Sequence, residues 1–184
     1  MAQIIQSGQN TAMPTRIVIL GSECTGKTTL AAKIAEHFKV NFASEYLREY
    51  FEMKNGHLTI NDAIPIAKGQ LEKERELELK GYCPLLCDTD IITSIVYSKY
   101  YFGKCPDWIE TEVMKRGSTH YLLCDIDVPW TADGQRDRPE EREYMQNLFL
   151  NELRERNLPF DIISGDIESR FNKSVTIINN LLHC

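Results

Sequence analysis

The sequence has little of the positive charge that nucleic-acid binding requires. Its 184 residues include 21 lysines and arginines against 27 aspartates and glutamates, which gives a formal net charge of −6. Proteins that bind DNA or RNA usually carry a basic stripe that neutralises phosphates, and no such stripe is visible in this sequence. We therefore expect no nucleic-acid partner.

Long apolar runs and a secretion signal are also missing. No stretch approaches the ~18 consecutive apolar residues of a membrane-spanning helix. Residues 1–15 lack a basic segment followed by an apolar run, and we expect them to form a flexible tail. The six cysteines form no C-x-x-C pair and have no zinc-finger spacing with the four histidines. These features predict no membrane association and a cytoplasmic protein with reduced thiols.

Two kinds of apolar segment alternate along the rest of the chain. Short apolar runs predict buried strands, and longer segments with apolar residues three and four apart predict amphipathic helices. The predicted strands are 16–20, 40–44, 84–88, 119–124 and 159–164. The predicted helices are 27–38, 63–80, 91–101, 106–116, 140–156 and 167–182. This alternation predicts one α/β domain over 16–184, a three-layer sandwich around a parallel sheet of about five strands.

A glycine-containing motif follows the first predicted strand. Residues 21–28 read G-S-E-C-T-G-K-T and lead into a predicted amphipathic helix. Gly21 and Gly26 let the backbone turn so that N–H groups point inward, and the helix presents its positive end to an anion. In such a phosphate loop, Lys27 reaches the β- and γ-phosphates and Thr28 binds Mg²⁺. We therefore predict ATP and Mg²⁺ as ligands. The predicted ATP contacts are Gly21, Ser22, Glu23, Cys24, Thr25, Gly26, Lys27, Thr28 and Thr29.

Two further absences narrow the class of nucleotide-binding protein. The N-K-x-D motif that reads guanine in GTPases is absent, and the chain is short for an oligomeric mechanical ATPase. The polar segment 129–142 instead carries three arginines, which is typical of the lid of a small-molecule kinase. We predict that Arg136 stabilises the transferred phosphoryl group and that Arg138 contacts ATP. For Arg142 we favour pairing with neighbouring glutamates.

Carboxylates that follow predicted strands supply candidates for a magnesium ligand and a general base. Asp88 ends the third predicted strand, where P-loop proteins hold Mg²⁺. Asp125 follows the fourth strand and is a second candidate. We prefer Asp88, because the third strand lies next to the first in kinase-type folds, and we expect Asp125 to cap a loop. Glu45 follows the second strand and is a candidate base for an acceptor hydroxyl; the alternative is that it caps a helix and pairs with Arg48.

Three more motifs accompany the phosphate loop. They are E-Y-L-R-E-Y at 45–50, D-T-D-I-I-T at 88–93 and W-T-A-D-G-Q-R at 130–136. In this order and spacing they resemble the ribosylnicotinamide kinase domain of NadR-type proteins, a family that also tends to have a glutamine at the position of Gln70. The resemblance covers about residues 15–182, and Cys24 stands where the family usually has a serine.

The resemblance implies ATP-dependent phosphorylation of the 5′-hydroxyl of nicotinamide riboside, giving nicotinamide mononucleotide for NAD salvage. It implies that Trp130 and Tyr46 stack on the cationic ring, although core or helix packing is the alternative for both. Asp90 or Asp133 would bind the ribose hydroxyls, and Arg48 would contact the phosphate being formed. An aspartate of the D-T-D motif is the alternative to Glu45 as the base.

The sequence also departs from NadR-type proteins, which often carry an adenylyltransferase domain and sometimes a DNA-binding domain. The H-x-G-H motif of nucleotidylyltransferases is absent. We expect this chain neither to complete NAD nor to act as a repressor, so that a separate adenylyltransferase is needed. Two other functions stay open, a kinase for another nucleoside or small alcohol and a nucleotide-dependent sensor of NAD precursors without turnover.

Overall fold

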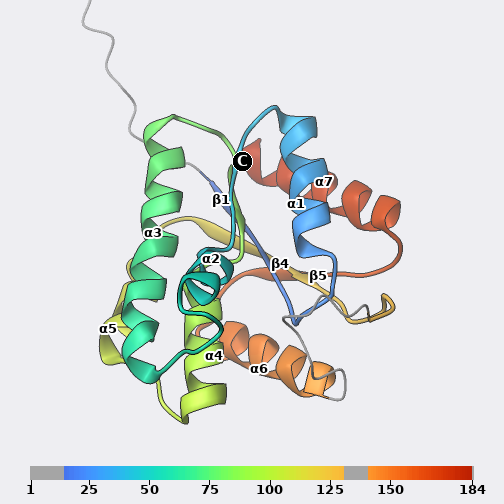
Figure 1. Ribbon diagram of the computed structural model, residues 1–184. Helices are drawn as coiled ribbons and strands as arrows, with labels where there is room; N and C mark the ends of the chain where they lie inside the picture. The colour runs from blue at the N-terminus through green and yellow to red at the C-terminus, as the bar shows by residue number, and fades with distance from the viewer. Residues whose placement is uncertain (1–14, 131–140, 184) are drawn as a thin grey trace, which may run out of the picture.

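Short strands alternate with helices along the chain, as the apolar pattern predicts. A computed structural model describes residues 15–130 and 141–183 (Figure 1). The strands are β1 (Arg16–Leu20), β2 (Phe42–Ala43), β3 (Leu85–Asp88), β4 (Thr119–Cys124) and β5 (Phe160–Ile163). The helices are α1 (Lys27–Phe38), α2 (Tyr46–Met53), the short 3₁₀ helix η1 (Ile60–Asp62), α3 (Ala63–Leu79), α4 (Ile91–Phe102), α5 (Asp107–Val113), α6 (Arg142–Glu155) and α7 (Ile167–Leu182).

All five strands are parallel and form one sheet in the order β2-β3-β1-β4-β5. The central strand β1 pairs with β3 on one side and β4 on the other, with Ile19 opposite Asp88 and Leu122. The prediction that the third strand lies beside the first is therefore confirmed. The chain first adds β2 and β3 on one side of β1 and then crosses over to add β4 and β5 on the other. Connections therefore diverge at the carboxyl end of β1, where parallel sheets bind ligands.

Helices cover both faces of the sheet and make three layers, which confirms the predicted fold class (Figure 1). On one face, α1 and α7 pack over Ile17, Ile19 and Leu122. On the other face, α3, α4, α5 and α6 pack over Val18, Leu20 and their neighbours. Alternate residues of β1 thus enter opposite cores, and all of Ile17 to Leu20 is fully buried. This double burial explains why the strand reads as a continuous apolar run.

Two elements differ from the sequence prediction. The strand β2 has two residues rather than five, because it lies at the edge of the sheet and pairs with β3 only at Phe42 and Ala43. Helix α2 was not among the predicted helices. It is only eight residues long, and none of its residues is fully buried.

Several predictions lie outside the described residues. Asp133, Arg136 and Arg138 fall in the segment 131–140, and the predicted tail falls largely within 1–14. The five cysteines that the structure describes are free thiols, as predicted. No helix in the described ranges combines the length and apolar character needed to cross a bilayer.

Candidate active site

The phosphate loop connects β1 to α1 and has a strongly curved backbone. Gly21, Cys24 and Gly26 all have positive φ, at 141°, 55° and 78°. Gly21 cannot be replaced without a clash, because an added Cβ would lie 2.7 Å from the carbonyl oxygen of Cys124. Left-handed residues alternating with ordinary ones turn successive N–H groups toward one concave side. The loop therefore has the conformation of an anion-binding nest.

The side chains of the loop divide into buried and exposed sets. Ser22 and Thr25 are buried, and the Thr25 hydroxyl donates to the Ser22 carbonyl oxygen at 2.9 Å. Their predicted ATP contacts are thus limited to the backbone. Gly26, Thr28 and Thr29 are exposed at the start of α1. The open side of the loop is therefore the beginning of this helix, where the positive end of the helix dipole lies.

Lys27 folds back over the loop. Its ammonium donates to the carbonyl oxygens of Gly21 at 3.0 Å and Ser22 at 2.8 Å, and the residue is only 7% exposed. These hydrogen bonds to carbonyl oxygens replace the water that a buried ammonium group loses. They also hold the charge directly beside the nest, where it favours a polyphosphate.

Thr28 and Asp88 form the candidate magnesium site. The Thr28 hydroxyl, in the first turn of α1, donates to Asp88 Oδ2 at 2.6 Å, and Asp88 is the last residue of β3. Asp88 is 2% exposed, and its Oδ1 has no hydrogen-bond partner among the described residues. Burial raises the pKa of this carboxyl above its usual range, although Thr28 and Lys27 oppose the shift. A buried carboxylate oxygen lacking a partner is what a cation would complete, so these residues fit Mg²⁺.

The second magnesium candidate has a different role. Asp125 Oδ1 accepts a hydrogen bond from the backbone N–H of Ile126 at 2.8 Å, which agrees with its predicted role in capping a loop. Within 15–130 and 141–183, no three acidic, histidine or cysteine side chains cluster as a metal site of their own. Mg²⁺ at Thr28 and Asp88 would therefore depend on phosphate oxygens and water for its remaining ligands.

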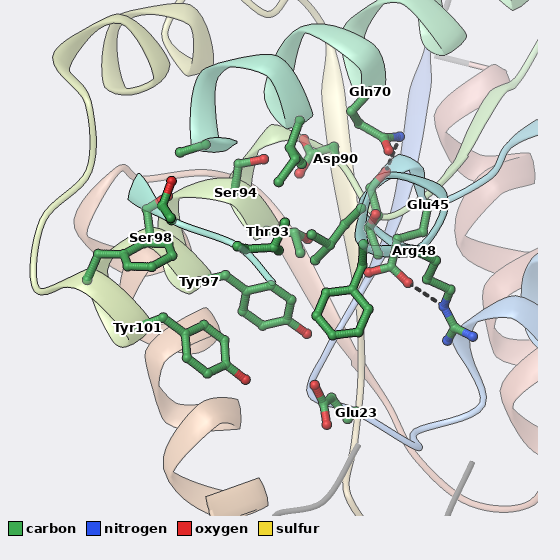
Figure 2. A pocket seen from close by; sticks show the side chains of 18 of the residues that line it. Glu23, Glu45, Arg48, Gln70, Asp90, Thr93, Ser94, Tyr97, Ser98 and Tyr101 are labelled. Atoms are coloured by element: carbon green, nitrogen blue, oxygen red, sulfur yellow. Dashed lines mark hydrogen bonds and ion pairs between the residues drawn. The ribbon is translucent and has the colours of Figure 1, made fainter. Parts of the chain in front are cut away.

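A cavity of about 410 Å³ opens beside the loop, a size suited to a small organic ligand (Figure 2). It lies among α2, α3 and α4 and is lined by Glu23, Glu45, Leu47, Arg48, Phe51, Gly56, Leu58, Thr59, Ala63, Ile66, Gln70, Thr89, Asp90, Thr93, Ser94, Tyr97, Ser98, Tyr101 and Phe102. Figure 2 shows Tyr97 and Tyr101 on one side, the pair Glu45 and Arg48 opposite them, and Glu23 on the phosphate loop.

Acidic side chains predominate among the charged residues of the cavity. Glu23, Glu45 and Asp90 line it, together with one arginine, Arg48. Arg48 Nε lies 2.8 Å from Glu45 Oε2, so the predicted pairing is present. Glu45 occupies the position before α2 but makes no side-chain capping bond. Glu23, predicted as an ATP contact, also lines this cavity.

Both carboxylate oxygens of Asp90 accept hydrogen bonds from other parts of the chain. Its Oδ1 accepts from the backbone N–H of Ile92 at 2.9 Å and caps α4, and its Oδ2 accepts from the Tyr121 hydroxyl at 3.0 Å. Arg116 Nε lies 3.5 Å from the same Oδ2, and Asp90 is 1% exposed. Both oxygens therefore have internal partners that fix the carboxylate in place, and the contact with ribose stays a prediction.

The aromatic rings at the cavity are not the predicted ones. The ring of Tyr46 packs against Gly69 of α3, which is the helix-packing alternative, and Lys73 lies 5.6 Å from the ring centre. Neither Tyr46 nor the half-buried Trp130 lines the cavity. The rings that do are Phe51, Tyr97, Tyr101 and Phe102. The four-residue spacing of the two tyrosines, just after the D-T-D motif, was the signal that the sequence offered.

Two buried polar residues hold the wall of the cavity. Gln70 accepts from the Tyr46 N–H at 2.9 Å and donates to the Thr89 carbonyl oxygen at 3.4 Å, which joins α2, α3 and the end of β3. Asp62 accepts from the backbone and hydroxyl of Thr59 and from the Tyr50 hydroxyl. Hydrogen bonds from the Thr59 backbone and from Lys54 hold the pKa of the Asp62 carboxyl well below its usual range.

Three side chains that the sequence analysis did not place at the site support the phosphate loop from outside. Gln146 accepts from the Ser22 N–H at 3.0 Å and donates to the Cys124 carbonyl oxygen at 2.8 Å. Arg142, for which we favoured pairing with neighbouring glutamates, donates to the carbonyl oxygen of Cys24 in the loop. Arg170 donates to that of Thr25. All three come from α6 and α7, more than 115 residues later in the chain than the loop. No local motif marks such partners.

Comparison with known families places this site in context. A family model described as an AAA domain matches residues 16–170. The chain belongs to this family. Two curated relatives are the trifunctional NAD biosynthesis/regulator protein NadR of Escherichia coli, 29% identical, and of Salmonella typhimurium, 28% identical. Both alignments span 173 residues and cover 90% of this chain, which spans 42% of the length of these relatives.

Solved structures confirm the fold. Crystal structures of NadR in complex with NR, and with NAD and AMP-PNP, superpose with TM-scores of 0.76 and 0.75 at 22% identity, covering 91% of this chain and 49% of theirs. Thymidylate kinase from Ehrlichia chaffeensis has a TM-score of 0.63 at 16% identity over 91% of this chain and 100% of that one. The AAA-family chain is thus a P-loop domain with a kinase-type fold that matches part of NadR, and the resemblance seen in its motifs is confirmed.

Proposed function

We propose that this chain is a P-loop kinase that transfers the γ-phosphoryl group of ATP to the 5′-hydroxyl of nicotinamide riboside. The observation that carries the proposal is the cavity, which adjoins the phosphate loop and joins aromatic rings to an excess of carboxylates. A NadR structure of the same fold was solved with NR, and another with AMP-PNP. NadR therefore provides a precedent for the proposed acceptor and for an analogue of the proposed donor.

The chemistry of the cavity suits a cationic nucleoside. Nicotinamide riboside carries a positive charge on an aromatic ring, which favours stacking on aromatic side chains and carboxylates nearby. Tyr97 and Tyr101 offer aromatic rings, and Glu23 and Glu45 offer negative charge in the same cavity (Figure 2). A neutral nucleoside would gain the stacking but not the charge interaction. We therefore assign ring recognition to Tyr97 and Tyr101 rather than to Tyr46.

Each described site residue has a defined task in the proposed transfer. Lys27 binds the donor phosphates, and Thr28 and Asp88 would hold Mg²⁺, which neutralises phosphate charge when bound. Glu45 is the better candidate for the base, because Asp90 spends both oxygens on internal partners and Glu45 lies at the cavity. Arg48 pairs with Glu45 and would orient that carboxylate, and its contact with the new phosphate stays a prediction.

The remaining assignments stay predictions. Arg136 as a stabiliser of the transferred charge, Arg138 as an ATP contact and Asp133 as a ribose contact all lie outside the described residues. Trp130 keeps a predicted role near the acceptor without support from the cavity lining. The proposed product is a mononucleotide, so formation of NAD would need an adenylyltransferase, which we assign to a separate activity.

A coupled assay of ADP release tests the proposed function. Wild-type protein with MgATP is offered nicotinamide riboside, nicotinic acid riboside, uridine, cytidine or no acceptor, and the mononucleotide is identified by mass. We expect strong stimulation by nicotinamide riboside and its loss in Lys27→Ala, which lacks the phosphate-binding cation. Stimulation by another nucleoside would replace the substrate but keep the kinase. ADP release that ignores every acceptor would favour a sensor of NAD precursors without turnover.

A further inference from the structure

Two arginines from different helices bind consecutive carbonyl groups on the outside of the phosphate loop. Arg142 Nη2, at the start of α6, donates to the carbonyl oxygen of Cys24 at 3.0 Å. Arg170 Nη1, in the first turns of α7, donates to the carbonyl oxygen of Thr25 at 2.8 Å. The two peptide groups at the apex of the loop are thus each held by a guanidinium.

Both guanidinium groups are anchored elsewhere, so they act as fixed points. Arg170 is 2% exposed and also donates to the carbonyl oxygens of Gly165 at 2.8 Å and Asp125 at 3.0 Å. It forms an ion pair with Asp127 as well. Arg142 donates through its second amino group to the carbonyl oxygen of Val128 at 2.8 Å. The planar fork of an arginine makes several such bonds at once, which a lysine cannot do.

Holding these carbonyls determines where the next N–H groups point. The peptide bond is planar and trans, so its C=O and N–H lie on opposite sides. A Cys24 carbonyl that points outward to Arg142 turns the Thr25 N–H to the other side. A Thr25 carbonyl that points outward to Arg170 does the same for the Gly26 N–H. The positive φ angles of Cys24 and Gly26 are consistent with this alternating arrangement.

Orientation rather than net charge is the main effect of Arg170, because Asp127 pairs with it. We propose that Arg142 and Arg170 are positioning residues that preorganise the phosphate loop for a polyphosphate by holding the carbonyl groups of Cys24 and Thr25 away from the nest. The inference rests on nucleotide binding at this loop, as the proposed function does, but not on the identity of the acceptor.

Calorimetric titration with two ligands tests the inference. Magnesium tripolyphosphate has only the phosphates, whereas MgATP also has the base and ribose. We expect Arg142→Gln and Arg170→Gln to bind both ligands about tenfold more weakly, the size expected when one charge-assisted hydrogen bond to the ligand is impaired. Arg156→Gln is the matched control, because Arg156 follows α6 and pairs with Glu110 and Glu152, far from the loop. It should bind both ligands like the wild type.

Three results would overturn the inference. One is tripolyphosphate affinity within about twofold of wild type in both variants. Another is weaker ATP binding with unchanged tripolyphosphate binding, which would mean that Arg170 acts through the loop at Gly165 instead. The third is an equal loss in Arg156→Gln. If Arg170→Gln fails to fold, the half-buried Arg142 decides the matter through Arg142→Gln. A wild type that binds tripolyphosphate but ignores nicotinamide riboside would refute the proposed substrate and leave this inference standing.

Discussion

Replacing Gly69 by alanine probes the contact that places α2 beside the cavity. An alanine Cβ at this position would lie 2.0 Å from Cε1 of Tyr46, whereas ordinary contacts begin at 3.4 Å. The ring would have to retreat by about 1.4 Å, the difference between these two distances. Tyr46 is the first residue of α2, between Glu45 and the cavity-lining Leu47 and Arg48. The strain therefore reaches the acceptor side of the site.

The expected size follows from two opposing effects. Overpacking costs ~1–3 kcal/mol, and replacing a glycine inside a helix by alanine returns up to ~1 kcal/mol. We expect Gly69→Ala to lower the free energy of unfolding by ~1–2 kcal/mol. In the proposed reaction, the KM for the acceptor should rise while the KM for ATP, bound at the phosphate loop, stays unchanged.

Urea denaturation of four proteins measures this effect. They are the wild type, Gly69→Ala, Tyr46→Ala and the double variant. In the Tyr46→Ala background the clash is gone, so Gly69→Ala should become neutral or stabilising through helix propensity alone. Equal effects of Gly69→Ala in both backgrounds would refute the packing role of Tyr46 and reopen its predicted contact with the acceptor.

Two further predictions concern the carboxylates. Burial raises the pKa of Asp88, so the folded state binds this proton more tightly than the unfolded state does, and the contribution of Asp88 to stability is lost as pH rises. Asp88→Asn should therefore raise the melting temperature at neutral pH without MgATP, and this gain should shrink as pH falls. The same variant should lose turnover roughly 100-fold, and a melting temperature below that of the wild type would contradict the reasoning. Glu45→Gln should reduce kcat by about 100-fold or more with little change in the KM for ATP, and a kcat near wild type would exclude Glu45 as the base.

Local sequence determined most of the secondary structure. The apolar run 16–20 is β1, and the apolar spacing after residue 27 gives α1 with the predicted bounds. The phosphate loop is equally local, since Gly21, Gly26 and Lys27 are close in the chain and their chemistry follows from backbone freedom and charge. The alternation of strands and helices was sufficient to predict a parallel sheet. The expected neighbourhood of the first and third strands then placed Asp88 beside β1, where the structure has it.

Only the tertiary structure decided which side chains meet at the site. Tyr46 belongs to a recognisable motif, yet its ring faces Gly69 rather than the cavity, because the direction of a side chain depends on how its helix is rotated. Asp90 Oδ2 accepts a hydrogen bond from Tyr121 of a distant strand, a contact that the D-T-D motif does not indicate. Arg170 reaches the phosphate loop across 145 residues. Such contacts arise from packing between elements, whereas motifs and apolar periodicity record only what neighbours in the chain require.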